Sequence, residues 1–149
     1  GTGVSGEVLG HKTQVVEQAL QRTYAIEEPL EVLRCLGGRE IAALVGAIFE
    51  AAERGIGILV DGFIVSSAAL VAVRHCPQVR DFMIFGHRSA EPGHQQILSS
   101  LKAEILVDCG LRLGEGSGAL TALPLVDAAV ELHNHMATFE EASVPDRDH

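Results

Sequence analysis

The sequence contains no tryptophan, one tyrosine and five phenylalanines among its 149 residues. Aromatic side chains therefore contribute little to the core, although the hydrophobic fraction is 47%, mostly alanine, leucine, valine and isoleucine. A chain of this length is about the size of one domain and buries about two thirds of its unfolded surface on folding. We therefore expect an aliphatic core, with disorder only at the chain ends.

Basic residues are also few: 11 lysines and arginines stand against 20 acidic residues, for a formal net charge of −9. Such a surface repels nucleic acid and anionic membranes, so we expect neither as a partner. An anionic small-molecule substrate stays open where local hydrogen-bond donors outweigh the overall field. No apolar run has the length of a membrane span, and the first residues lack a signal-peptide pattern. We therefore expect a cytoplasmic protein.

Cysteine is scarce, and its spacing does not favour metal binding. Cys35, Cys76 and Cys109 form no C-x-x-C pair, and we expect them to be small buried apolar side chains in a reducing compartment. His133 and His135 lie two residues apart on a predicted helix, where their rings point to different faces. We therefore predict no disulfide, no metal site and no cofactor.

Apolar residues alternate between helical and strand-like spacing along the chain. Residues 41–52 form the clearest helical stripe, whereas residues 56–60 are a continuous apolar run typical of a strand buried on both faces. Pro124 is expected to kink or break the last helix. Further helices are expected over 13–22, 29–36, 65–75, 95–101 and 117–135, and further strands over 82–85 and 105–107. This alternation predicts an α/β fold, a three-layer, Rossmann-like parallel sheet with helices on both faces.

Polar loops follow the three predicted strands, at residues 61–63, 86–94 and 108–118. Ligands of open parallel sheets bind beyond the carboxyl ends of the strands, so the loops are expected to converge on one site. In the third loop, glycines alternate with Glu115 and Ser117 just before a predicted helix. Glycine lets a backbone approach a ligand, and the N–H groups of a helix start favour anions. A carboxylate would repel such an anion, so Glu115 indicates a base beside a phosphate; the alternative is a simple tight turn.

The second loop contains polar side chains with competing structural roles. Ser89 offers a hydroxyl donor and Arg88 a cation. His87 and His94 are expected to hold the loop together through hydrogen bonds, because no third residue has metal-ligand spacing. Glu91 either satisfies N–H groups of the loop or takes a catalytic role, and the sequence leaves both open.

The chain is similar to the nicotinate-nucleotide:dimethylbenzimidazole phosphoribosyltransferases in several separate stretches. These are the loop segments 59–63, 87–94 and 110–118, in the family's order, and the helical segments 29–44 and 127–140. The resemblance covers residues 1–144 and implies the C-terminal portion of such an enzyme, with 145–149 as a disordered tail. Gly1-Thr2-Gly3 would then be the end of a glycine-rich segment of the family, and part of the acceptor pocket would lie outside this chain.

The family transfers the ribose 5-phosphate of nicotinate mononucleotide to 5,6-dimethylbenzimidazole, without a metal. The products are nicotinate and α-ribazole phosphate, which supplies the lower ligand of cobalamin. The resemblance implies that Glu115 is the general base that takes the benzimidazole proton, and that the assembly is a homodimer. It also implies that the following residues bind substrate: Lys12, Asp61, Gly62, Ser89, Ala90, Arg112, Leu113, Gly114, Gly116, Ser117 and Gly118.

Two other hypotheses compete with the transferase. The first is a non-catalytic remnant that binds a nucleotide or phosphate at the sheet edge. The second is an interaction domain that uses exposed apolar helix faces. Glu115 and its glycines favour the enzyme, because a binding remnant would not need that carboxylate.

Overall fold

The computed structural model describes residues 6–144, so both Gly1-Thr2-Gly3 and the expected tail at 145–149 lie outside the described residues. Its centre is a sheet of three parallel strands in the order β1-β2-β3. The strands are β1 (Ile58–Val60), β2 (Met83–His87) and β3 (Ile105–Val107). In the register, Val60 pairs with Phe85 and Phe85 pairs with Ile105. All three strands therefore end at one edge of the sheet.

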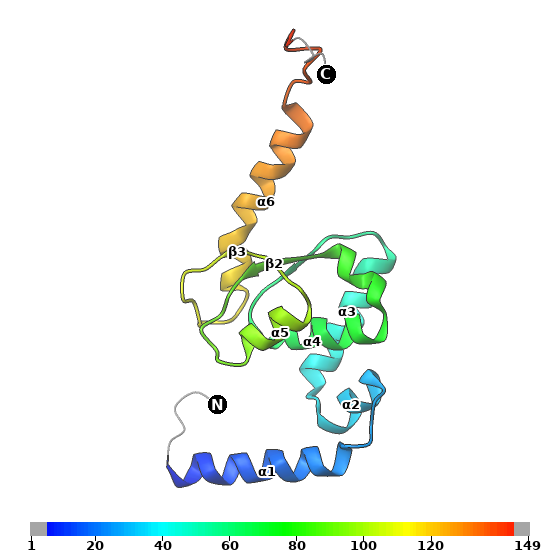
Figure 1. Cartoon of the computed structure of the whole chain (residues 1–149), viewed down its shortest axis with the longest axis vertical. Helices are drawn as coiled ribbons and strands as arrows, with labels where there is room; N and C mark the ends of the chain where they lie inside the picture. Colours follow the sequence, from blue (N-terminus) through cyan, green and yellow to red (C-terminus); the bar gives the residue numbers. More distant parts are fainter. Residues whose placement is uncertain (1–5, 145–149) are drawn as a thin grey trace, which may run out of the picture.

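Helices precede, connect and follow the strands (Figure 1). They are α1 (Glu7–Thr23), α2 (Pro29–Leu36), α3 (Arg39–Glu53), α4 (Phe63–His75), the 3-10 helix η1 (Pro77–Phe82), α5 (His94–Ser100) and α6 (Ser117–His135). Within residues 6–144, no helix is both long and apolar enough to cross a membrane.

The two faces of the sheet are covered by different helices. Val60 and Phe85 are almost fully buried in one apolar cluster with residues of α3, α4 and α5. Ile84 and Leu106 face the other way and line a groove together with α6. The side chains of a strand alternate between its faces, so α6 lies opposite the α3–α5 layer. The α/β fold with helices on both faces is therefore confirmed.

Local sequence signals explain why several helices begin and end where they do. At α2, the Glu28 carboxylate accepts a hydrogen bond from the Glu31 N–H at 2.7 Å, and Pro29 occupies the first helical position. After α3, Gly55 takes the left-handed conformation at φ +69°. The bounds of α2, β3 and α6 agree with the sequence prediction, whereas α1 begins earlier, at Glu7.

Two expectations about local structure were wrong, and a third is narrowed to one of its two alternatives. The run 56–60 is not buried on both faces: Ile56 is exposed and Ile58 half-buried, because β1 is an edge strand with the start of α6 beside it. Of the kink or break expected at Pro124, the break does not occur, because α6 continues to His135. Cys35 and Cys109 are exposed rather than buried, since they lie at a helix end and in a loop.

Candidate functional site

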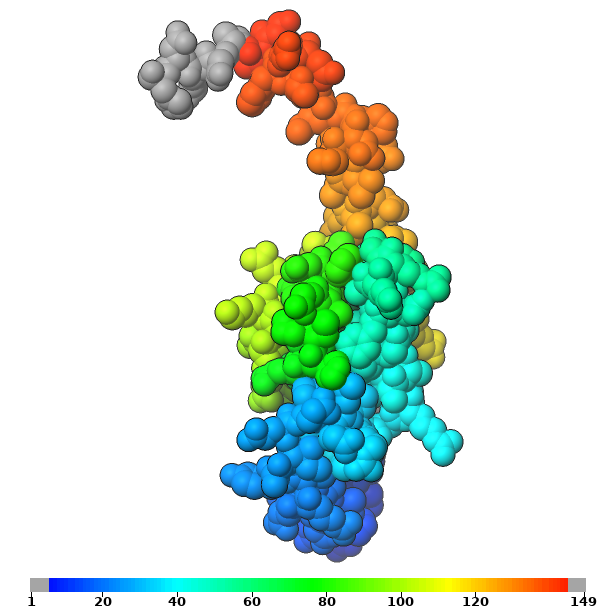
Figure 2. Space-filling view, turned by 90° about the vertical axis from the view of Figure 1, so that its right-hand side faces the viewer, coloured from blue at the N-terminus to red at the C-terminus, as the bar shows by residue number. Residues whose placement is uncertain are grey.

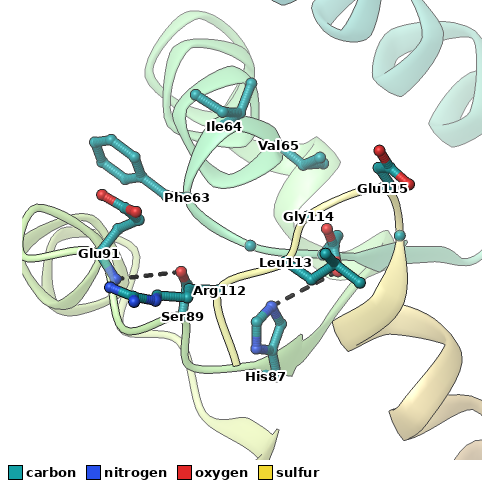
Figure 3. Close-up of a pocket in the computed structure, with 13 residues that line it drawn as sticks. Phe63, Ile64, Val65, His87, Ser89, Glu91, Arg112, Leu113, Gly114 and Glu115 are labelled. Carbon is teal, nitrogen blue, oxygen red and sulfur yellow. Dashed lines mark hydrogen bonds and ion pairs between the residues drawn. The ribbon is translucent and has the colours of Figure 1, made fainter. Parts of the chain in front are cut away.

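A cavity of about 640 Å³ lies beyond the carboxyl ends of β1 and β2 (Figure 3). It is formed by the segments that follow all three strands, as the sequence predicted. Its lining residues are Asp61, Gly62, Phe63, Ile64, Val65, His87, Ser89, Glu91, Arg112, Leu113, Gly114, Glu115 and Gly116. In Figure 3, Glu115 lies across the cavity from Phe63 and Glu91, with Leu113 between them.

Glu115 has an unusual backbone conformation. Its φ is +59°, in the left-handed region, and its neighbours Gly114 and Gly116 have φ of +82° and +79°. Glycine adopts such angles without strain, but a side chain there costs about 1–2 kcal/mol. Non-glycine residues with this strain concentrate at functional sites, where the surrounding structure holds them in place. Lys102 (φ +47°) and Ser143 (φ +53°) share this conformation, but of the three only Glu115 lines the cavity.

The first turn of α6 is capped by a side chain from the end of β1 rather than by its own N-cap residue. Gly116 is the N-cap and has no side chain to offer. Instead, Asp61 accepts a hydrogen bond from the Ala119 N–H, with 2.9 Å between Oδ1 and N. Asp61 is 8% exposed, and its carboxylate lies at the positive end of the helix. The Ala119 N–H is one of the helix-start groups expected from the sequence to favour an anionic ligand. It donates instead to a carboxylate of the protein itself.

His87 fills the space between the ends of β1 and β2 and the start of α6. The residue is 3% exposed, and its Nε2 lies 3.6 Å from Oδ1 of Asp61. A β-carbon at Gly118 would overlap the ring, and one at Gly62 would come within 3.1 Å of Nε2. Both glycines were expected to contact substrate. The structure shows that a side chain at Gly118 would collide with this ring, whereas one at Gly62 would be in tight contact with it.

His94 ties the second loop to α4. It is completely buried, and its Nδ1 accepts a hydrogen bond from the Ser89 N–H at 2.9 Å. The proton must then be on Nε2, which lies 2.9 Å from the Ser66 hydroxyl. Burial lowers the pKa of His94, and the nearby His87 lowers it further, while Asp61 acts in the opposite direction. The prediction that His94 holds the loop together is therefore confirmed.

The second and third loops are joined to each other. The Ala90 N–H donates to the Leu111 carbonyl at 3.0 Å, and Arg88 pairs with Asp108. Hydrogen bonding to Arg88 lowers the pKa of the Asp108 carboxyl and raises that of the guanidinium. These contacts fix the N-terminal end of the third loop, which leads to Glu115.

The structure brings most of the expected substrate-binding residues to one cavity. Eight of the expected site residues line it: Asp61, Gly62, Ser89, Arg112, Leu113, Gly114, Glu115 and Gly116. Ala90, Ser117 and Gly118 lie beside it without lining it, and Lys12 is on α1, which packs against α2.

Sequence reasoning missed the apolar wall formed by Phe63, Ile64 and Val65, because α4 was expected to begin only at Val65. His87 and Glu91 were noticed but not counted among the site residues. The apolar wall could have been predicted because these three residues directly follow Asp61-Gly62 at the end of β1. Within residues 6–144, no three His, Cys, Asp or Glu side chains are grouped so that they could hold a metal ion.

Comparison with known proteins identifies similar chains. A family model described as phosphoribosyltransferase matches residues 1–144. A relative from Pseudomonas syringae pv. syringae is 59% identical over 148 residues, covering 99% of this chain and 42% of the relative. A relative from Azotobacter vinelandii is 56% identical over 147 residues, covering 98% of this chain and 42% of the relative. Both are named nicotinate-nucleotide–dimethylbenzimidazole phosphoribosyltransferase.

Solved structures agree in fold as well as in sequence. An enzyme of that name from Thermus thermophilus has a TM-score of 0.86 at 43% identity, covering 97% of this chain and 44% of that one. A structure of CobT from the same organism has a TM-score of 0.88 at 44% identity, covering 99% and 44% of the two chains. The 149 residues thus span less than half the length of the proteins they match.

Proposed function

The chain belongs to the phosphoribosyltransferase family, and from that membership we propose that it transfers ribose 5-phosphate from nicotinate mononucleotide to 5,6-dimethylbenzimidazole. The products would be nicotinate and α-ribazole phosphate, for assembly of the lower ligand of cobalamin. The observation that carries the proposal is the placement of Glu115, held in a left-handed backbone at the wall of a cavity.

In the proposed reaction, Glu115 is the general base. One ring nitrogen of the benzimidazole attacks C1′ of the ribose as the bond from C1′ to the nicotinate nitrogen breaks. The electron pair of that bond leaves with nicotinate, and the proton on the other benzimidazole nitrogen passes to the Glu115 carboxylate. Attack from the face opposite the leaving group inverts the anomeric centre. A well-placed base contributes about 10²–10⁴-fold to such a reaction.

The two substrates differ in polarity, and the cavity offers surfaces for both. Phe63, Ile64, Val65 and Leu113 supply apolar surface suited to a flat dimethylated ring. Arg112 is the only lysine or arginine among the lining residues and would pair with an anionic group of nicotinate mononucleotide. Ser89 and the backbone of 114–118 would contact the phosphoribosyl group.

We also propose that the protein is a cytoplasmic homodimer. Three free cysteines, of which Cys35 and Cys109 are exposed, fit a reducing compartment. The C-terminal half of α6 extends away from the body of the molecule (Figure 2), where Leu132 is 64% exposed and Met136, at the C-cap, is 73% exposed. Such apolar surface favours association. Light scattering is expected to give a dimer mass; a monomer mass over a wide concentration range would contradict this.

The activity is tested by measuring nicotinate release from nicotinate mononucleotide, with 5,6-dimethylbenzimidazole present, in the intact protein. We expect Glu115→Gln to lower kcat by about 10²–10⁴-fold. Glu104→Gln is a matched control, because Glu104 is exposed just before β3 and does not line the cavity. Binding of nicotinate mononucleotide without release by the unmodified protein would instead favour the non-catalytic binding module.

A further inference from the structure

The start of α6 must be held in place for Glu115 to have a fixed position, because Glu115 directly precedes its N-cap, Gly116. The N–H groups of a first helical turn lack partners within the helix, and the third helical residue is a usual target of a capping side chain. In α6 that residue is Ala119. Its partner is Asp61, which is 58 residues away in the sequence.

We propose that Asp61 is a positioning residue: from the end of β1 it caps α6 and thereby holds Glu115 at the cavity wall. This assignment rests on the proposed function, and it differs from the substrate contact that the family resemblance implied for Asp61. Oδ1 of Asp61 is engaged with the Ala119 N–H. The carboxylate is nearly buried, so its attraction to the helix end is little screened by solvent.

The segment that contains Glu115 is held at both of its ends. At the first end, the Leu111 carbonyl accepts from the Ala90 N–H at 3.0 Å, and at the second, Ala119 donates to Asp61. Between them, the Ser117 N–H donates to the Gly114 carbonyl at 3.1 Å. A left-handed glutamate persists only where the surroundings fix it. Loss of the second anchor would therefore let the residue relax away from its position.

His87 supports the same anchor from the end of β2. Its ring lies against Gly118, and its Nε2 is 3.6 Å from Oδ1 of Asp61. Because His87 is the last residue of β2, it fixes the distance between that strand and the start of α6. The pair thus links the ends of β1 and β2 to the first turn of α6, which begins two residues after the proposed base.

The test compares Asp61→Asn with Asp61→Ala in the intact protein. Asparagine keeps an oxygen that accepts from the Ala119 N–H, whereas alanine does not. We expect Asp61→Ala to lower kcat by about 10²-fold with KM for nicotinate mononucleotide nearly unchanged, because a misplaced group costs about this much. Asp61→Asn is expected to retain kcat within about threefold, since the cap persists. Asp127→Asn, on the exposed side of α6, is the matched control.

A second measurement does not depend on turnover. Hydrogen exchange at the Ala119 amide is expected to become about five- to tenfold faster in Asp61→Ala, with shifted Glu115 and Ser117 amide resonances, and to stay unchanged in Asp61→Asn. Loss of activity in Asp61→Asn with a raised KM would overturn the proposal and indicate a substrate contact. Unchanged Ala119 exchange in Asp61→Ala would also overturn it. If Asp61→Ala does not fold, Asp61→Asn alone decides. If the unmodified protein protects the Ala119 amide from exchange but has no turnover, the proposed transferase activity is refuted, whereas the capping of α6 by Asp61 is not.

Discussion

Replacement of His94 by leucine tests whether the loop that contains Ser89 is held from inside the protein. Leucine fills much of the space of the imidazole but neither accepts from the Ser89 N–H nor bonds to the Ser66 hydroxyl. Two buried polar groups then lose their partner, and each such loss costs about 1–3 kcal/mol. The expected decrease in the free energy of unfolding is therefore about 2–6 kcal/mol, a large part of the stability of a domain.

Urea denaturation followed by circular dichroism measures this decrease. For a urea m-value of about 1–3 kcal/mol/M, the midpoint should fall by about 0.7 M or more. His11→Leu is the matched control, because His11 is exposed on α1 and the change should stay within about 0.5 kcal/mol. A decrease below about 1 kcal/mol for His94→Leu would refute the role of His94 as a tether, since the two hydrogen bonds would then contribute little.

The same tether predicts the direction of a pH effect. The pKa of His94 is lowered from its ordinary value of 6.5, chiefly by burial. Between the lowered pKa of the folded protein and 6.5, the unfolded chain therefore binds a proton that the folded protein does not, and the unfolding free energy falls as the pH falls through this window. Above it, the contribution is fully present. Because leucine does not titrate, His94→Leu should flatten this part of the pH profile; an unchanged slope would assign the effect to another group.

Two further predictions concern the surroundings of the cavity. Gly118→Ala should lower the free energy of unfolding by about 1–3 kcal/mol in thermal denaturation, because its β-carbon would overlap the His87 ring; Gly46→Ala, at an open position of α3, should not destabilise the protein. Arg88→Ala should raise the pKa of the Asp108 carboxyl from its lowered value in an NMR titration, since the guanidinium is the main cause of the lowering. If Arg88→Ala leaves the pKa of Asp108 unchanged, the ion pair does not persist in solution.

Periodicity in the sequence was sufficient to predict the order of the α-helices and strands, though not η1, and the edge of the sheet at which the cavity lies. It succeeded because the helices that pack on the sheet carry an apolar stripe, as α3 does with Val45 and Ile48. It failed at β1, because a continuous apolar run does not reveal that Ile56 lies outside the sheet and remains exposed. At Pro124 it could not choose between a kink and a break, and the structure excludes the break, since α6 accommodates a residue that usually ends a helix.

Contacts between distant residues were beyond sequence reasoning. The bond from Asp61 to Ala119 joins two segments that the sequence placed at the same edge, but nothing in a single sequence specifies which N–H group a carboxylate will reach. The same holds for the ring of His87 beside Gly118. Glycines in a loop were therefore attributed to ligand approach, whereas the structure shows that Gly118 also gives space to a buried side chain.

The conformation of Glu115 bears on the choice between an enzyme and a binding module. A loop built only to approach a phosphate would take glycine at this position as well, since both flanking positions already are glycines with positive φ. A glutamate there is less favourable by about 1–2 kcal/mol in backbone energy and repels an anion. Both disadvantages fall on one residue, and the proposed removal of a proton at the cavity would account for its carboxylate. The proposed transferase therefore accounts for this combination better than a module that only binds phosphate.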